Sequence, residues 1–127
     1  MQPDRVSFGQ LLLALDATLV SLVSAPRGLD LPVGSAALLD ADDLQLGLAA
    51  AAGSADLFFL LGVDTADVLG WLDRHERRPV AIFAKHPAPT VVERAAQAGI
   101  AVVAVDPRAR WERLYRLVGH VFEHHRD

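Results

Sequence analysis

The sequence predicts a single α/β domain spanning residues 1–127, with a mixed sheet of about five strands that is parallel in its C-terminal half. Three continuous apolar runs, at 57–61, 80–84 and 101–105, are typical of strands that are covered on both faces. The segments between these runs have amphipathic helical patterns, so strands and helices alternate as they do in right-handed crossover units. Hydrophobic residues make up 52% of the chain and charged residues 22%, which is enough apolar material for one core.

The first part of the chain predicts one short helix and two strands. Ser7 to Gln10 has the S-x-x-Q pattern of a capping box, and leucines follow at helical spacing, so we expect a helix from about Phe8 to Asp16. The β-branched and apolar run from Thr18 to Ser24 predicts a strand, and Ala36 to Leu39 predicts a second, shorter one.

An irregular stretch separates these two strands. The run APRGLDLPVGSAALLDADDL, from Ala25 to Leu44, contains two prolines, two glycines and four aspartates. Gly28 can supply a positive φ, Pro32 fixes an extended backbone, and aspartate side chains can accept from nearby amides, so the stretch can hold one shape before its strand. A second hypothesis is that this rigid loop, together with the loops after the parallel strands, frames a small-molecule or domain-docking site.

Two helices are expected between the apolar runs. The first begins at Asp64-Thr65, carries an apolar stripe of Val68, Leu69, Trp71 and Leu72, and ends in the charged run 73–78. The second begins with a capping box at Thr90 to Glu93 and ends before Gly99, with Val92, Ala95 and Ala96 facing inward. Right-handed crossovers place both helices on one face of three parallel strands, and the first and last helices must then cover the other face.

The last helix is expected from about Arg108 to His125, with Asp106-Pro107 as its cap. Its apolar stripe consists of Trp111, Leu114, Tyr115, Val118, Val121 and Phe122, and Leu117 lies off the stripe. Sequence alone leaves open whether this stripe packs on its own sheet or on a partner. No glycine or proline ends the helix before the chain stops, so we expect the chain to be a fragment of a longer protein.

Composition excludes several classes of protein. The net charge of −4 and the single lysine, Lys85, indicate that this domain does not bind nucleic acid directly. The chain has no cysteine, no secretion signal and no apolar run of the ~18 residues that a membrane span needs, so we expect a cytoplasmic protein with no membrane contact. His120 and His124 could share a zinc ion, but no third ligand is identifiable, and no metal or cofactor is predicted.

Charged residues after the strands are the candidate ligand-binding groups. Acidic residues at 40, 42, 43 and 64 together with Lys85 resemble the charged residues of a phosphate-accepting receiver domain. Only one strand fits between Asp43 and Asp64, and a receiver domain needs two strand–helix units there. We therefore reject the receiver domain and interpret Asp64 as a helix cap. Lys85 and His86 follow a strand at the edge where open α/β sheets bind ligands, although a solvated loop that carries one lysine and one histidine is the simpler explanation. The predicted contact set is Asp30, Asp40, Asp42, Lys85 and His86.

The elements G-L-D-L-P-V at 28–33, L-D-A-D-D-L at 39–44 and D-L-F-F-L-L-G at 56–62 resemble the signature of the N-terminal domain of the PucR family, the purine catabolism regulators of bacteria. The run AAQAGIAVVAV at 95–105 also fits that family, so the resemblance covers nearly the whole chain. It implies a sensory domain that precedes a middle domain and a DNA-binding helix-turn-helix, in a family some of whose members respond to purine metabolites. The chain departs from the pattern at Gly34, where many relatives have a basic residue, and in the alanine-rich segment 45–52.

Three functions are therefore weighed. The first is a regulatory module of a bacterial transcription regulator that binds a small metabolite or docks to other domains of the regulator, without enzymatic activity. The second is an interaction module without a ligand, in which the last helix pairs with its counterpart in a homodimer. The third and least favoured is a small enzyme that uses Lys85 and nearby aspartates; no hydrolase, nucleotide or dinucleotide motif supports it.

Overall fold

The computed structural model describes residues 6–42, 55–74 and 79–124, and its fold is the predicted mixed α/β class. A five-stranded sheet has the order β2-β7-β6-β5-β4. β4 to β7 are parallel, and β2 lies antiparallel to β7 at one edge. The strands are β2 (Val20–Ser24), β4 (Ala36–Asp40), β5 (Leu57–Leu61), β6 (Ala81–Lys85) and β7 (Ala101–Val105). The short run at 36–39 therefore adds a fourth parallel strand to the three that the apolar runs predict.

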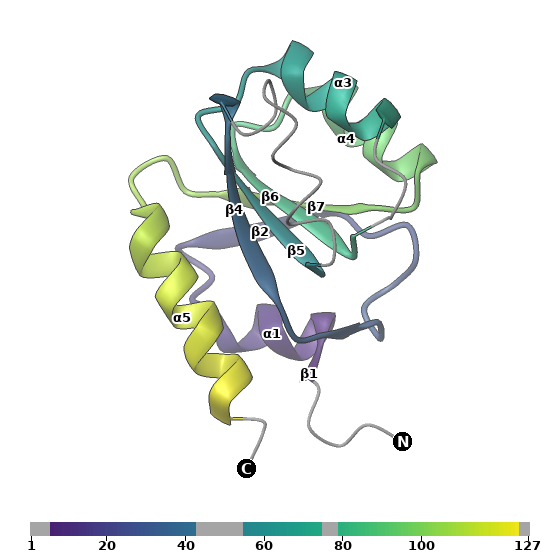
Figure 1. Ribbon diagram of the computed structural model, residues 1–127. Coiled ribbons are helices and arrows are strands. Elements are labelled where there is room, and N and C mark those ends of the chain that lie inside the picture. The colour runs from purple at the N-terminus through teal and green to yellow at the C-terminus, as the bar shows by residue number, and fades with distance from the viewer. Residues whose placement is uncertain (1–5, 43–54, 75–78, 125–127) are drawn as a thin grey trace.

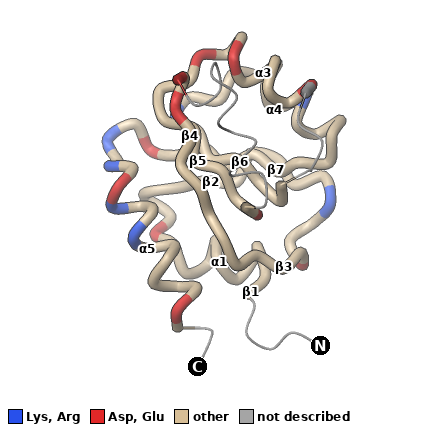
Figure 2. Tube along the Cα trace, in the orientation of Figure 1, with Lys and Arg blue, Asp and Glu red and all other residues tan. Residues whose placement is uncertain are grey.

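The three central strands are buried on both faces, as their lack of polar alternation predicts. β5 and β7 contain no charged residue, and the only charge in β6 is Lys85 at its last position. Figure 2 shows the charged residues gathered outside these strands. Because no ionisable group has to be desolvated within them, the central strands can sit between two layers of helices.

Helices cover both faces of the sheet (Figure 1). α3 (Thr65–Arg74) and α4 (Pro89–Gln97) lie on one face, and α1 (Phe8–Ala14) and α5 (Trp111–His124) lie on the other, as the right-handed crossovers predict. Asp64 caps α3, because its Oδ1 accepts from the amide of Asp67 at 3.0 Å. None of the helices in the described ranges has the length and apolarity that crossing a membrane requires.

The capping box expected at Thr90 is wrong. α4 begins at Pro89, and its N-cap residue, Ala88, makes no side-chain hydrogen bond. Proline fixes φ near the helical value and needs no amide partner in the first turn, so it starts the helix without a polar cap. Val91 is consequently buried against the sheet in place of Val92, which is half-buried. Gly99 has the expected positive φ, 78°, after the helix.

α5 begins at Trp111, three residues later than predicted, because residues 107–110 form a turn. Asp106 is therefore not its cap. Leu114 and Val118 are buried in the core, so the apolar stripe packs on the chain's own sheet. One assignment is wrong, because Leu117, which the predicted stripe excludes, packs against the core. Tyr115 lies at the margin of the stripe: its ring contacts Phe59, but it is 41% exposed over the edge strand β4.

A small second sheet was not predicted. β1 (Val6–Ser7) pairs antiparallel with β3 (Pro32–Val33) beside α1. Two-residue strands are too short to show a hydrophobic period, so the sequence gives no signal for them. The capping box of α1 is confirmed: Ser7 and the side chain of Gln10 accept from each other's amides at 3.1 and 2.9 Å.

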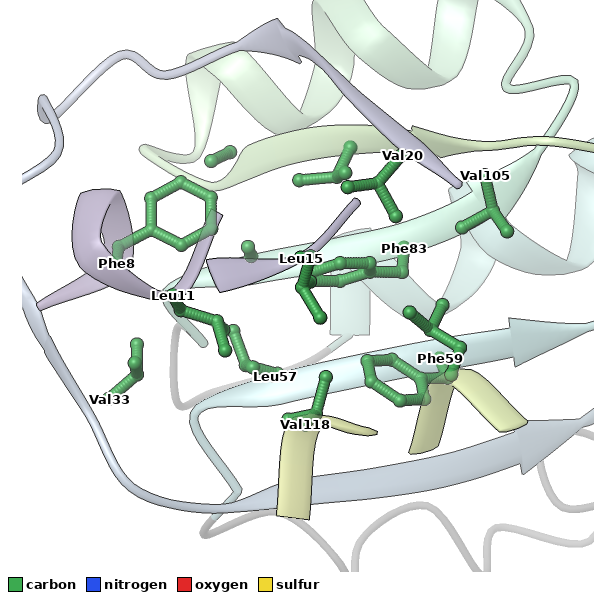
Figure 3. Close-up of a cluster of buried hydrophobic side chains, with 14 of the residues drawn as sticks. Phe8, Leu11, Leu15, Val20, Val33, Leu57, Phe59, Phe83, Val105 and Val118 are labelled. Carbon is green, nitrogen blue, oxygen red and sulfur yellow. The ribbon is translucent and has the colours of Figure 1, made fainter. Parts of the chain in front are cut away.

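The core has two parts, one on each face of the sheet. Alternate residues of β5 point to opposite faces, so Phe59 enters the cluster under α1 and α5, and Phe58 enters the cluster under α3 and α4. Figure 3 shows the first cluster, in which side chains of α1, β2, β5, β6, β7 and α5 meet. The ring centroids of Phe59 and Phe83 lie 4.9 Å apart at its centre.

Candidate functional site

The irregular stretch between β2 and β4 lies at the amino-terminal edge of the parallel strands. The amides of Phe8 and Gly9, at the start of α1, donate to the carbonyls of Leu31 and Leu29, each at 2.8 Å. Gly28 has the expected positive φ, 84°, and Pro32 lies in extended backbone within β3. These bonds hold residues 28–33 against the start of α1, and the stretch supplies partners for free amides of the first helix.

Asp56 joins three strands at this same edge. Its Oδ2 accepts from the amide of Gly34 at 2.9 Å, and its amide donates to Ser35 Oγ at 3.0 Å. Its carbonyl accepts from the amide of Val80 at 2.7 Å, just before β6. Asp56 thus links the residues that precede β4, β5 and β6.

Lys85 lies at the opposite, carboxyl-terminal edge of the sheet. It is the last residue of β6, pairs in register with Val105 and is half-buried. Its Nζ lies 5.6 Å from the centroid of the Trp111 ring at the start of α5. That ring lies 6.0 Å from the ring of Phe59, so the core positions it. A cation over an indole face is stabilised by roughly 0.5–1 kcal/mol, which favours one orientation of the lysine side chain.

His86 follows with an unusual backbone conformation. Its φ is 53°, and it is the only residue other than glycine with a positive φ in the described part of the chain. A residue before proline is usually extended, and here Pro87 comes next. Backbone strain of this kind persists only where surrounding contacts enforce it, and it is concentrated at binding sites. The sharp turn directs the chain from the end of β6 toward the start of α4.

A pocket of about 230 Å³ opens beside Lys85. It lies where β5 and β6 end and where α3 and α4 begin, which is the usual place for ligands in open α/β sheets. Most of the described residues that line it have apolar side chains, and Lys85 is the only one of them with a permanent charge. A wall of this kind with one cation favours a small ligand that has an apolar body and one acceptor or anionic group. Leu60, Gly62, Val63, Thr65, Val68, Ala84, Lys85, His86, Pro87, Ala88, Val91 and Trp111 line it.

The predicted contact set does not form one site. Lys85 and His86 line the pocket together, but Asp40 and Asp42 do not. Asp40 ends β4 at the same edge, but β5 lies between β4 and β6, so it is separated from Lys85 by roughly 10 Å of sheet. Asp30 precedes β3 and lies at the other edge, beside the first helix. The structure therefore brings Lys85 and His86 together and places Asp30, Asp40 and Asp42 outside their pocket. Asp43, from the rejected receiver constellation, lies outside the described residues.

Trp111 is the pocket residue that the sequence does not reveal. Its helical spacing predicts a core residue, and it does pack against the core, but its ring also forms the wall beside Lys85. Only the approach of α5 to the end of β6 brings the two side chains together. Within the described residues, no group of three or more histidine, cysteine, aspartate or glutamate side chains is placed to hold a metal ion.

Two aspartates stabilise turns at this edge. The amide of Thr18 donates to Asp16 Oδ1 at 2.9 Å, and the amide of Arg108 donates to Asp106 Oδ1 at 2.8 Å. These backbone hydrogen bonds are the main cause that lowers the pKa of each carboxyl below the ordinary value of 3.8. Positive charge adds to the effect, from Arg113 at Asp16 and from Arg108 and Lys85 at Asp106.

The free energy of unfolding is therefore expected to fall with acid. The unfolded chain binds protons at these carboxyls more readily than the folded chain does, so their contribution is complete above pH 3.8 and is lost as the pH drops through the lowered pKa values. Urea unfolding between about pH 5 and about pH 2 measures the slope. The double variant Asp16→Asn, Asp106→Asn should show a shallower slope than the original chain, and equal slopes would contradict the assignment.

The fold and the pocket define an α/β domain with a small-molecule-sized hollow at the carboxyl-terminal edge of its sheet. Comparisons of the chain with models of protein families, with curated proteins and with solved structures find no match.

Proposed function

We propose that this chain is the sensory domain of a bacterial transcription regulator of the PucR type, and that it binds a small metabolite in the pocket beside Lys85. The observation that carries the proposal is the pocket itself, with one half-buried cation, an indole wall and a strained turn at the edge of the sheet. Bound metabolite would contact α5 through Trp111, and a change in the position of α5 is the signal that would pass to the rest of the regulator.

The small-enzyme alternative needs Lys85 to act with nearby aspartates. Among the described residues, no aspartate lines the pocket, and its polar members besides Lys85 are Thr65 and His86. General acid–base catalysis needs its acid or base within hydrogen-bond reach of the substrate, so the pocket does not support a lysine–aspartate pair. A binding function needs only the cation and the apolar wall, which are the features that the pocket has.

Titrations with candidate metabolites test whether the pocket binds one of them. Calorimetry and thermal-shift measurements with a panel of ureides, purines and nucleosides should find at least one ligand that binds at a single site and raises the melting temperature. A hydrogen bond to a charged group contributes about 1.5–3 kcal/mol, so Lys85→Met should lower the affinity for that ligand by about 10- to 100-fold. Arg116→Met removes an exposed charge that does not line the pocket, and it should leave the affinity unchanged.

Because the chain has a single lysine, NMR can report directly on ligand binding beside Lys85. Reductive methylation with ¹³C places a label on Lys85 and on the N-terminal amine only, because the chain has no other lysine. The metabolite should shift the Lys85 signal with the same saturation curve that calorimetry gives. If no member of the panel binds, or if a bound ligand leaves this signal in place, the pocket is not the sensor site, and docking to other domains becomes the better explanation of the fold.

A further inference from the structure

Arginines are concentrated where α5 begins. Four of the 12 lysine and arginine residues of the chain lie between positions 108 and 116, although the net charge is −4. Figure 2 shows lysine and arginine positions along the segment that leads into α5 and along its first turns. The clustering is not explained by pairing: in the described part of the chain, the only ion pair that involves these four arginines joins Arg108 to Asp106 at 3.3 Å.

Three of these arginines line a pocket of about 320 Å³, which we call the arginine pocket. It lies between the turn before β2, the turn after β7 and the first turns of α5. Its lining residues are Thr18, Leu19, Asp106, Arg108, Ala109, Arg110, Arg113 and Leu114. It shares no lining residue with the pocket beside Lys85, so the two can be tested separately.

The charges of the arginine pocket are unbalanced. Its lining contains three guanidinium groups and one carboxylate, that of Asp106, which already accepts from the amide and the side chain of Arg108. The side chains of Arg110 and Arg113 have no hydrogen bond or ion pair to another residue that the structure describes. Asp16 accepts from the amide of Thr18, and Arg113 acts on it only through its charge. Two arginines are thus available to an anion from outside.

We propose that the arginine pocket binds a small, multiply charged anion through a phosphoryl group. Guanidinium groups present paired N–H donors that match phosphate oxygens, so Arg110 and Arg113 can each donate two hydrogen bonds to the anion. A nucleic-acid backbone fits less well, because it needs positive charge along an extended surface, whereas Asp106 and Glu112 flank these arginines in a chain of negative net charge.

The test uses inorganic phosphate, pyrophosphate and ribose 5-phosphate at constant ionic strength, with chloride as the reference anion. Saturable shifts of the backbone amide signals of Ala109 and Leu114 in two-dimensional NMR are expected with at least one phosphate compound at millimolar concentration. Arg113→Gln and Arg110→Gln should each weaken binding about tenfold or more, which is about 1.4 kcal/mol. Arg116→Gln, an exposed arginine outside the pocket, should leave the affinity unchanged.

The outcomes distinguish free phosphate from a phosphorylated metabolite as the source of the phosphoryl group. Equal affinity for phosphate and ribose 5-phosphate indicates a site for the free ion, and tighter binding of the sugar phosphate indicates a phosphorylated metabolite. The proposal is overturned if no phosphate compound gives a saturable shift, or if Arg116→Gln weakens binding as much as Arg113→Gln, because the effect would then be that of general charge. Lys85→Met should not change phosphate binding, so failure here leaves the metabolite proposal standing.

Discussion

Replacing Phe59 by alanine is expected to lower the free energy of unfolding by about 3–5 kcal/mol. Phe59 is completely buried at the centre of the cluster under α1 and α5. Its ring lies 4.9 Å from that of Phe83, 6.0 Å from that of Trp111 and 5.8 Å from that of Tyr115, measured between centroids. Truncation would remove the contacts that join β5 to α5 and would leave a cavity that the rigid sheet cannot close.

Urea unfolding measures this effect as a lower midpoint with an unchanged slope, since the surface exposed on unfolding stays similar. Phe59→Leu keeps part of the side-chain volume and should cost less than Phe59→Ala. Leu13→Ala is the matched control: Leu13 is 87% exposed on α1, so its loss should change stability by no more than about 0.5 kcal/mol. If Phe59→Ala and Leu13→Ala have similar effects, the packing of α5 on the sheet is not as described.

Asp56→Ala is expected to destabilise the fold by about 1.5–3 kcal/mol, the usual contribution of a hydrogen bond to a charged group. The substitution removes the acceptor of the Gly34 amide, at 2.9 Å and partly buried, while the backbone bonds of Asp56 to Ser35 and Val80 stay in place. The amide of Gly34 would then have no partner at the junction that leads into β4. The loss should be concentrated at that edge strand, whose amides should exchange with solvent faster.

Asp56→Asn separates hydrogen bonding from charge. The asparagine side chain keeps a carbonyl oxygen that can accept from Gly34, so this variant should recover at least half of the stability that Asp56→Ala loses. Chemical unfolding measures all three chains, and hydrogen exchange of β4 locates the change. Equal losses in the two variants would mean that the negative charge, and not the hydrogen bond, stabilises the junction.

Much of the fold could be predicted because its signals are local. The capping box at Ser7 and the positive φ at Gly28 and Gly99 follow from the preferences of single residues and short motifs. The second helix of the crossover units shows the limit: a capping box at Thr90 and a proline at Pro89 both satisfy a local rule, and α4 uses the proline, with its N-cap two residues before Thr90. Neighbouring residues point about 100° apart on an α-helix, and the tertiary packing selects Val91, in place of Val92, for the core.

The candidate site was harder to predict, because it depends on which ends of strands and helices meet in space. Lys85 and His86 were found from their position after an apolar strand, which is a local signal. Asp30 was included because its loop is rigid, but rigidity does not indicate which edge of the sheet a loop serves. Trp111 and the arginine pocket gave no signal, since their meaning depends on the approach of α5 to β6 and to the turn before β2.

The sequence by itself determined the class of the fold, the central strands and the face on which each helix lies, because apolar runs and crossover handedness act within a short length of chain. Only the tertiary structure decided which charged groups share a site. The strand order puts β5 between Asp40 and Lys85, and the β1–β3 pair holds Asp30 at the far edge. Contacts between distant segments depend on the order and register of the strands, which no local pattern of residues records.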